Sequence, residues 1–382
     1  MTEKLVELGR WLQAQGYKFT VVTPATHARV LPRHPRAQSL RDIFGWSAPF
    51  SETEFPRVAK LLRGADACEP VGELLKSRVR FASAGPSLFV HSAYPTVEDD
   101  SVFFGPDTYR FLRALQSLAG PLGRLIDLGT GSGVAGIHLS REATETVLTD
   151  VSSAALRMAQ VNAELAGRRV LLVRSNLLDS VEGCVDTVIS NPPFLADQQQ
   201  RTYRDGGGHI GTGLGIAIVE QSLERLAAHG RLLLYTGAPI VDGVDVFKSA
   251  LDEIDKSRVR EWRYEEIDAD IFGEELEQPG YEDVDRIAAV ALTVRVAAGG
   301  SAVRHLTPRS AETPRPRTAR RIPPSSRRIS RASHTSRSAR RTRRLRSATP
   351  PAGTHGRPGS RPSSSSRARR RALDEAPSAP YR

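Results

Sequence analysis

Four consecutive residues, Asn191-Pro192-Pro193-Phe194, have side chains and backbone groups suited to binding an amino group. Proline has a fixed φ and no backbone N–H, so this segment is rich in acceptors, among them the Asn191 side-chain oxygen and the Pro192 carbonyl. Two converging acceptors can hold an NH2 group, while the Phe194 ring can stack on the planar system that carries it. The segment follows the apolar run Val185–Ser190, so we expect it at the end of a strand, where α/β sheets bind ligands.

A glycine-rich turn lies upstream, in Asp127-Leu128-Gly129-Thr130-Gly131-Ser132-Gly133. It follows the apolar run Arg124–Leu128, and glycine there permits a sharp turn and a close approach of the backbone to a ligand. The spacing differs from the dinucleotide-binding GxGxxG pattern, because Val134 follows the third glycine. Asp150 ends the next apolar run, about 20 residues after the glycines, where a carboxylate can accept hydrogen bonds from both ribose hydroxyls. The turn and the acid together predict an adenosine-containing ligand.

With these motifs in register, residues 94–298 resemble a class I S-adenosylmethionine-dependent methyltransferase of the small-domain group, which carries an (N/D)PP(Y/F/W) motif. That group includes the HemK/PrmC protein-glutamine methyltransferases and enzymes that methylate amino groups in ribosomal and transfer RNA. The resemblance implies S-adenosyl-L-methionine as the cofactor and methyl transfer to a planar amino or amide nitrogen. It assigns catalysis to Asn191, Pro192, Pro193 and Phe194, with Asn191 and Phe194 also contacting the acceptor.

The resemblance also implies the cofactor contacts, residue by residue. Asp150 is expected at the ribose, and the methionine end is expected at Asp127, Gly129, Thr130, Gly131, Ser132 and Gly133. Asn176 and Leu177 occupy the place where the group has an acidic or amide residue beside the adenine. Thr108 lies in Phe104-Gly105-Pro106-Asp107-Thr108, which is similar to the Pro-x-Thr segment that closes over the cofactor in HemK-like enzymes. The Arg that precedes that segment in those enzymes is absent here.

Two classes of acceptor fit this reaction. Ser-Asn-Pro-Pro-Phe resembles the ribosomal RNA enzymes more than the Tyr form of the glutamine enzymes, which favours an exocyclic base amine of RNA. The alternative is a protein glutamine, because a helical N-terminus followed by a hairpin is similar to the HemK layout. A hypothesis from a different class is a catalytically silent protein that binds nucleic acid through its Arg-rich tail and has no cofactor affinity.

The elements that must position these motifs alternate along residues 122–298. Short β-rich apolar runs alternate with helical spacing, as between Leu156 and Ala166 after the N-capping Ser152. This pattern predicts an α/β fold with a Rossmann-like, mostly parallel sheet that ends in an antiparallel hairpin. The expected strands are Arg124–Leu128, Thr146–Asp150, Val170–Val173, Val185–Ser190, Leu232–Thr236, Arg258–Tyr264 and Arg286–Val296.

The first 93 residues are expected to form an accessory domain that recognises the substrate. Residues 3–76 have mostly helical patterns, with Phe19–Val22 as a strand candidate. The segments Arg78–Ser83 and Leu88–Ser92 flank Ala84-Gly85-Pro86-Ser87, which predicts a β-hairpin.

The formal net charge of +11 divides unevenly along the 382 residues. Residues 301–382 contain 22 Arg, no Lys and three acidic residues, which leaves 32 basic and 40 acidic side chains in the first 300 residues. Ser, Pro and Arg dominate residues 299–382 and large apolar residues are sparse, so we expect a disordered tail. Its Arg residues could bind nucleic acid nonspecifically, or could reflect a GC-rich coding sequence.

Composition narrows the remaining possibilities. The two cysteines are far apart and have no Cys or His cluster near them, so neither a disulfide framework nor a metal site is expected. The N-terminus MTEKLVELGRW lacks the apolar core of a signal peptide, and no apolar run approaches the ~20 residues of a membrane helix. We therefore expect a cytoplasmic protein without membrane contact, of an oligomeric state that the sequence does not predict.

Overall fold

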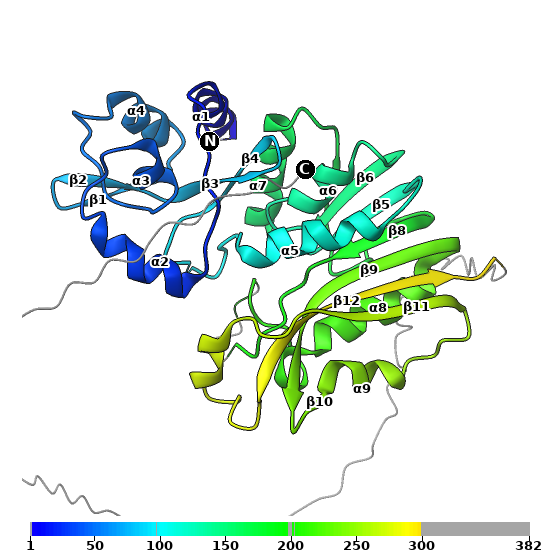
Figure 1. Ribbon diagram of the computed structural model, residues 1–382. Helices are drawn as coiled ribbons and strands as arrows, with labels where there is room; N and C mark the ends of the chain where they lie inside the picture. Colours follow the sequence, from blue (N-terminus) through cyan, green and yellow to red (C-terminus); the bar gives the residue numbers. More distant parts are fainter. Residues whose placement is uncertain (1, 97, 198–200, 202, 299–382) are drawn as a thin grey trace, which may run out of the picture. The chain divides into compact units, whose positions relative to one another are not determined.

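The computed structural model describes residues 2–96, 98–197, 201 and 203–298 (Figure 1). The tail predicted at residues 299–382 lies outside the described residues. The central sheet has eight strands in the order β11-β12-β9-β8-β5-β6-β7, with β10 paired to β9. Its strands are β5 (Arg124–Leu128), β6 (Glu145–Asp150), β7 (Leu171–Arg174), β8 (Val185–Ser190), β9 (Leu226–Val241), β10 (Val244–Asp245), β11 (Val259–Asp268) and β12 (Arg286–Val296).

The directions of the strands confirm the predicted sheet. Strands β5, β6, β7, β8 and β9 run parallel, whereas β12 is antiparallel to both of its neighbours, β9 and β11. The chain passes from β5 outward to β6 and β7, then returns to β8 on the other side of β5. Strands β5 and β8 therefore flank the topological switch point, where open α/β sheets bind their ligands.

Helices cover both faces of the sheet. Successive side chains of a strand point to opposite faces of the sheet. On one face, Leu125 of β5 packs in a hydrophobic cluster with residues of α5 (Pro106–Ala114) and α6 (Val134–Leu139). On the other face, Ile126 packs in a cluster with residues of α8 (Gly213–Arg225) and α9 (Val246–Asp252). The helix predicted after β6 is α7 (Ser153–Leu165), which packs on the α6 side. It begins where the Ser152 hydroxyl accepts a hydrogen bond from the Ala155 N–H.

The N-terminal part is mostly helical and contains two hairpins. Its helices and strands are α1 (Thr2–Ala14), α2 (Pro24–Val30), α3 (Leu40–Phe44), α4 (Pro56–Gly64), β1 (Cys68–Val71), β2 (Leu74–Ser77), β3 (Val79–Ala84) and β4 (Ser87–Ser92). Short 3-10 helices along the described chain are η1 (Leu31–Arg33), η2 (Leu115–Ser117), η3 (His209–Gly211) and η4 (Gly273–Glu277). The predicted hairpin is β3–β4. The domain boundary at residue 93 stays a prediction.

The N-terminal hairpin is joined to the glycine-rich turn by one buried amide. The Asn162 side chain of α7 accepts from the Val90 N–H at 2.7 Å and donates to the Val90 carbonyl at 3.0 Å. The same amide donates to the Ser132 carbonyl at 2.8 Å. Since Asn162 is fully buried, losing any of these bonds would leave a buried polar group without a partner. This amide therefore fixes the turn against α7 and β4.

Two local predictions in this region were wrong. Phe19–Val22 is not a strand, because its backbone makes no ladder: the Phe19 carbonyl accepts from the Ser83 N–H, and the Val21 N–H donates to the Tyr109 hydroxyl. The β1–β2 hairpin at Cys68–Ser77 was predicted as part of a helical segment. Strand β1 is largely exposed and contains Pro70, so it lacks the apolar alternation that identifies a strand.

Three further properties concern only the described part of the chain. None of its helices combines the length and apolar character needed to cross a membrane. Cys68 and Cys184 are both free thiols. Within the same residues, no three His, Cys, Asp or Glu side chains are grouped so as to hold a metal ion.

Candidate active site

A cavity of about 370 Å³ lies at the switch point, where β5, β6 and β8 end. Every residue predicted for the site except Gly133 lines it, namely Thr108, Asp127, Gly129, Thr130, Gly131, Ser132, Asp150, Asn176, Leu177, Asn191, Pro192, Pro193 and Phe194. The motifs are far apart in the sequence, and the parallel sheet brings them together because its strands end at one edge.

Asp127, the fourth residue of β5, holds the glycine-rich turn through hydrogen bonds to its carboxylate. Its Oδ2 accepts a hydrogen bond from the Thr130 hydroxyl at 2.7 Å and from the Gly136 N–H at 2.9 Å. The side chain is buried, and this burial raises the pKa of Asp127 to about 6 in spite of both donors. One carboxylate therefore fixes both the turn and the first helical residues after it.

The three glycines of the turn serve two purposes. All adopt positive φ, of 63° at Gly129, 54° at Gly131 and 80° at Gly133. A Cβ added at Gly129 or Gly131 would meet no atom within 4 Å, so a ligand can approach the backbone there. A Cβ at Gly133 would lie 2.9 Å from the Ile137 side chain and 3.1 Å from that of Ala159. Gly133 thus lies behind the cavity, where it allows close packing of α6 on α7.

Asp150, the last residue of β6, joins the second motif to the first. One carboxylate oxygen accepts from the Gly131 N–H at 3.0 Å, and the other accepts from the Ser152 N–H at 2.8 Å. Burial raises the pKa of Asp150 above that of a solvated aspartate. Each carboxylate oxygen has a second lone pair, so both can also accept a hydrogen bond from a ribose hydroxyl.

The remaining predicted cofactor residues, Asn176, Leu177 and Thr108, also line the cavity. Asn176 follows β7, is exposed, and donates from its amide to Asp179 at 3.3 Å. Leu177 has a left-handed φ of 48°, and the buried Ser175, which was not predicted, also lines the wall. Thr108 accepts from the Gly105 N–H at 3.3 Å, so its hydroxyl also caps the start of α5.

The Asn-Pro-Pro-Phe segment is held at the end of β8. The Ser190 hydroxyl donates to the Leu128 carbonyl at 2.8 Å, which ties the end of β8 to that of β5. The Asn191 side chain has no hydrogen-bond partner among the described residues, and it lines the cavity. The Phe194 ring is only 8% exposed and contacts the Phe272 ring edge-on at 5.9 Å. A Cβ at Gly237 would lie 2.3 Å from the Phe194 ring, so this glycine makes room for it.

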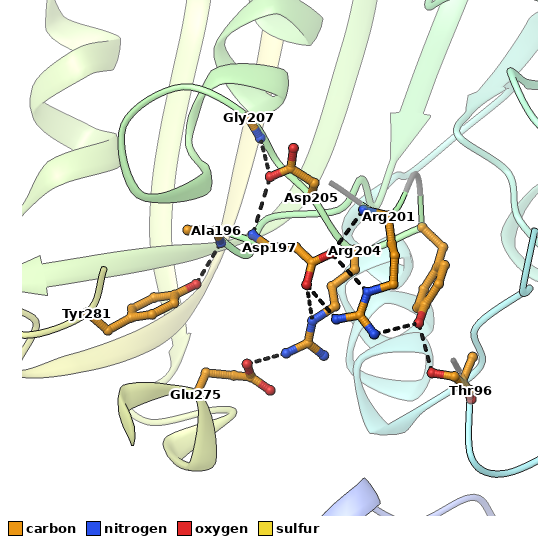
Figure 2. Close-up of polar contacts among 10 residues, drawn as sticks. Thr96, Ala196, Asp197, Arg201, Arg204, Asp205, Gly207, Glu275 and Tyr281 are labelled. Atoms are coloured by element: carbon orange, nitrogen blue, oxygen red, sulfur yellow. Dashed lines mark hydrogen bonds and ion pairs between the residues drawn. The ribbon is translucent and has the colours of Figure 1, made fainter. Parts of the chain in front are cut away.

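An ion-pair network that was not predicted forms the wall beyond Phe194 (Figure 2). Asp197 accepts from the backbone and side chain of Arg201, both at 2.9 Å, and lies 3.3 Å from the Arg204 guanidinium. Arg204 lines the cavity and pairs with Glu275 of η4. These residues lie in an irregular segment and in a 3-10 turn, where no periodicity could indicate that they meet.

Hydrogen bonds secure this wall on two sides. The Tyr281 hydroxyl accepts from the Ala196 N–H at 2.7 Å, and the Tyr203 hydroxyl donates to the Thr96 carbonyl at 2.8 Å (Figure 2). Tyr203 and Asp205 line the cavity. The segment after Phe194 is therefore attached both to the C-terminal hairpin region and to the chain that precedes α5.

Asp107 is a second unpredicted residue of the site. It precedes Thr108 on α5, lines the cavity and is buried. The Tyr235 hydroxyl donates to its carboxylate at 2.7 Å, and Arg110, which also pairs with Asp268 at 2.9 Å, donates at 3.1 Å. Burial raises the pKa of Asp107 despite these partners. Its partner Tyr235 of β9 is 128 positions away in the sequence, so no local pattern could have predicted that Asp107 belongs to the site.

These contacts fit S-adenosylmethionine. The Asp150 carboxylate has free lone pairs for ribose hydroxyls, and the space over Gly129 and Gly131 is open to a ligand. The Asp127 and Asp107 carboxylates lie in the same cavity, and can face the cationic groups of the methionine end.

Comparison with known proteins agrees with this geometry. Residues 107–238 match the family described as methyltransferase small domain. The chain is 32% identical over 197 residues to the release factor glutamine methyltransferase of Cereibacter sphaeroides, covering 48% of this chain and 66% of that protein. For the protein of the same name from Agrobacterium fabrum, the identity is 29%, with 51% and 66% covered.

A relative with a different name is the ribosomal RNA small subunit methyltransferase C of Shigella flexneri serotype 5b, 31% identical over 25% of this chain and 31% of that protein. The chain spans no more than 66% of the length of these three relatives. The family match at residues 107–238 includes both the glycine-rich turn and the Asn-Pro-Pro-Phe motif. Residues 107–238 therefore form a methyltransferase small domain, on the Rossmann-like sheet of the class I S-adenosylmethionine-dependent methyltransferases.

Proposed function

We propose that this protein transfers the methyl group of S-adenosylmethionine to the nitrogen of a planar NH2 group. The supporting observation is Asn191, whose side chain lines the cavity and has no hydrogen-bond partner among the described residues. The carbonyl of Pro192 lies in the same segment, and neither proline has an N–H that could compete for acceptors. The segment therefore has hydrogen-bond acceptors for a ligand that carries N–H donors.

The cofactor, when bound, supplies a sulfonium methyl that is already an activated electrophile. The contribution of the chain is to place the acceptor nitrogen in line with that methyl and to exclude water. Hydrogen bonds from the NH2 group to Asn191 and Pro192 disperse the positive charge that develops on nitrogen during transfer. The proton can leave after methylation, so this mechanism requires no general base.

For the acceptor, we propose the side-chain amide of a protein glutamine. The charged residues that line the cavity are one arginine, Arg204, and five aspartates, namely Asp99, Asp107, Asp127, Asp150 and Asp205. Asp107, Asp127 and Asp150 are assigned to the cofactor, which leaves Asp99, Asp205 and Arg204 for the acceptor, a lining without the excess of basic side chains that would attract phosphates. Proteins named release factor glutamine methyltransferase are among the relatives, which supports the same choice.

An exocyclic base amine of RNA is the second candidate. The Phe form of the motif at position 194 favours it, as does the relative named as a ribosomal RNA methyltransferase. A base can stack on the exposed part of an aromatic ring, which an aliphatic amide does less well.

Transfer of a radiolabelled methyl group into fractionated lysate tests both acceptors. Label that is removed by protease and resists RNase would support the glutamine amide, and the reverse would support the base amine. A wild-type protein that neither binds S-adenosylmethionine in calorimetry nor transfers label would contradict the proposed function and leave the silent nucleic-acid-binding hypothesis.

A further inference from the structure

One carboxylate oxygen in the cavity, Oδ2 of Asp107, has no hydrogen-bond partner among the described residues. Asp107 is only 4% exposed, and both of its donors, the Tyr235 hydroxyl at 2.7 Å and the Arg110 guanidinium at 3.1 Å, reach the same atom, Oδ1. No donor among the described residues reaches Oδ2, and the side chain lines the cavity. Oδ2 is therefore open to the cavity, and a cationic ligand that donates a hydrogen bond to it is stabilised there.

The surroundings hold this oxygen in place. The Arg110 guanidinium is itself fixed by Asp268 at 2.9 Å, and the Tyr235 ring is fully buried. Nearby lining side chains such as Phe111, Ala135 and Phe194 are apolar and provide no donor. Burial raises the pKa of Asp107 although Tyr235 and Arg110 oppose it, so the negative charge is not fully compensated by the protein.

Asp127, which lines the same cavity, has the same arrangement. Both of its donors, the Thr130 hydroxyl and the Gly136 N–H, reach Oδ2, and no described donor reaches Oδ1. Two buried carboxylates thus each present one open oxygen to one cavity. The ribose hydroxyls have Asp150 and the acceptor NH2 has Asn191, which leaves the amino-acid end of the cofactor for Asp107 and Asp127.

We infer that Asp107, on α5, is the counter-ion of the cofactor's α-ammonium group, which donates a hydrogen bond to Oδ2 of this aspartate. An ammonium is a compact cation with three donors, so one can go to Asp107 and another to Asp127. This inference rests on the cofactor of the class and not on the acceptor proposed above.

Calorimetric titration of the full chain with two ligands tests this role. S-adenosylhomocysteine has the amino-acid end, whereas 5′-methylthioadenosine has the same nucleoside and lacks it. In Asp107→Asn the amide can still accept from Tyr235 and Arg110, but an NH2 group then faces the ammonium. We expect the affinity for S-adenosylhomocysteine to fall about 10- to 100-fold, as for a lost charged hydrogen bond, while that for 5′-methylthioadenosine stays unchanged.

Two variants serve as controls. Asp268→Asn weakens the ion pair that positions Arg110 without changing a cavity-lining residue, so it should lower the affinity for S-adenosylhomocysteine far less than Asp107→Asn does and leave that for 5′-methylthioadenosine unchanged. Asp150→Ala should weaken both ligands, because both contain the ribose. An equal loss for both ligands in Asp107→Asn would mean a structural role and overturn the inference. An unchanged affinity for S-adenosylhomocysteine would also overturn the inference. Tighter binding of this ligand would overturn it too, because it would mean that the ligand's carboxylate, and not its ammonium, faces residue 107. Methyl transfer is not measured, so these results are independent of the acceptor.

Discussion

Asp127 is a buried carboxylate next to the glycine-rich turn, so its ionisation should change the free energy of unfolding with pH. The pKa of Asp127 is about 6 in the folded protein, against 3.8 for an ordinary aspartate. Below pH 4 the side chain is protonated in both states and contributes nothing. As the pH rises to 6 the unfolded chain loses its proton first, so the folded state is disfavoured above that pH by on the order of 3 kcal/mol.

Asp127→Asn should therefore be more stable than the wild type at pH 7.5 and lose this advantage as the pH falls to 4. The oxygen of the introduced amide can still accept from Thr130 and Gly136, so the turn keeps its anchor. Thermal unfolding of both proteins at a series of pH values measures the difference. A variant that is less stable by the same amount at every pH would show that the carboxylate contributes through geometry and not through charge.

Asn191→Ala should separate chemistry from cofactor binding. The substitution removes an acceptor that contacts only the methyl-accepting group, so methyl transfer should fall by roughly 100-fold or more, a loss similar to removing one preorganised hydrogen bond at a reacting centre. Cofactor affinity, measured by calorimetry, should stay at the wild-type level. A collapse of that affinity would place Asn191 at the cofactor and contradict the assignment.

At the level of elements, the glycine-rich turn can be tested with a matched pair of glycines. Gly129 and Gly167 have nearly the same φ, 63° and 62°, and a Cβ at either would meet no atom within 4 Å. Alanine at each position should thus cost about the same 1–2 kcal/mol of stability for its left-handed conformation.

The two variants should differ in cofactor binding, because only Gly129 lines the cavity. Gly129→Ala should weaken S-adenosylhomocysteine in calorimetry, whereas Gly167→Ala should bind it like the wild type. Equal affinities of the two variants would show that the ligand does not approach the turn at Gly129.

Elements with a strong local pattern were the ones predicted correctly. The apolar runs of β5, β6 and β8 appear in full in the sequence, since a strand buried on both faces leaves a continuous apolar signal. Strand β9 is much longer than the predicted Leu232–Thr236, because its start pairs with β8 and its second half pairs with β12 and β10, partners that the local sequence does not reveal. Phe19–Val22 has the composition of a strand, but the hairpin β3–β4 offers it only isolated hydrogen bonds.

For the molecule as a whole, the net positive charge of the chain should be independent of cofactor binding. The first 300 residues hold more acidic than basic side chains, and every residue assigned to the site lies among them. Deleting residues 301–382 should give a protein that binds an anion exchanger at neutral pH and retains the wild-type affinity for S-adenosylhomocysteine. Loss of that affinity would show that the tail contributes to the site.

The sequence alone determined the class of fold and the three motifs, because alternating apolar runs, a glycine-rich turn and Asn-Pro-Pro-Phe are all local signals. Only the tertiary structure decided which side chains share the cavity with them. Asp107 meets Tyr235 and Arg204 meets Glu275 across 128 and 71 positions of the chain. Such contacts depend on the order of strands and the packing of irregular segments, which no local pattern encodes. The tertiary structure likewise places Gly133 outside the cavity lining, at a close contact between α6 and α7, because only the folded chain determines which atoms surround a glycine.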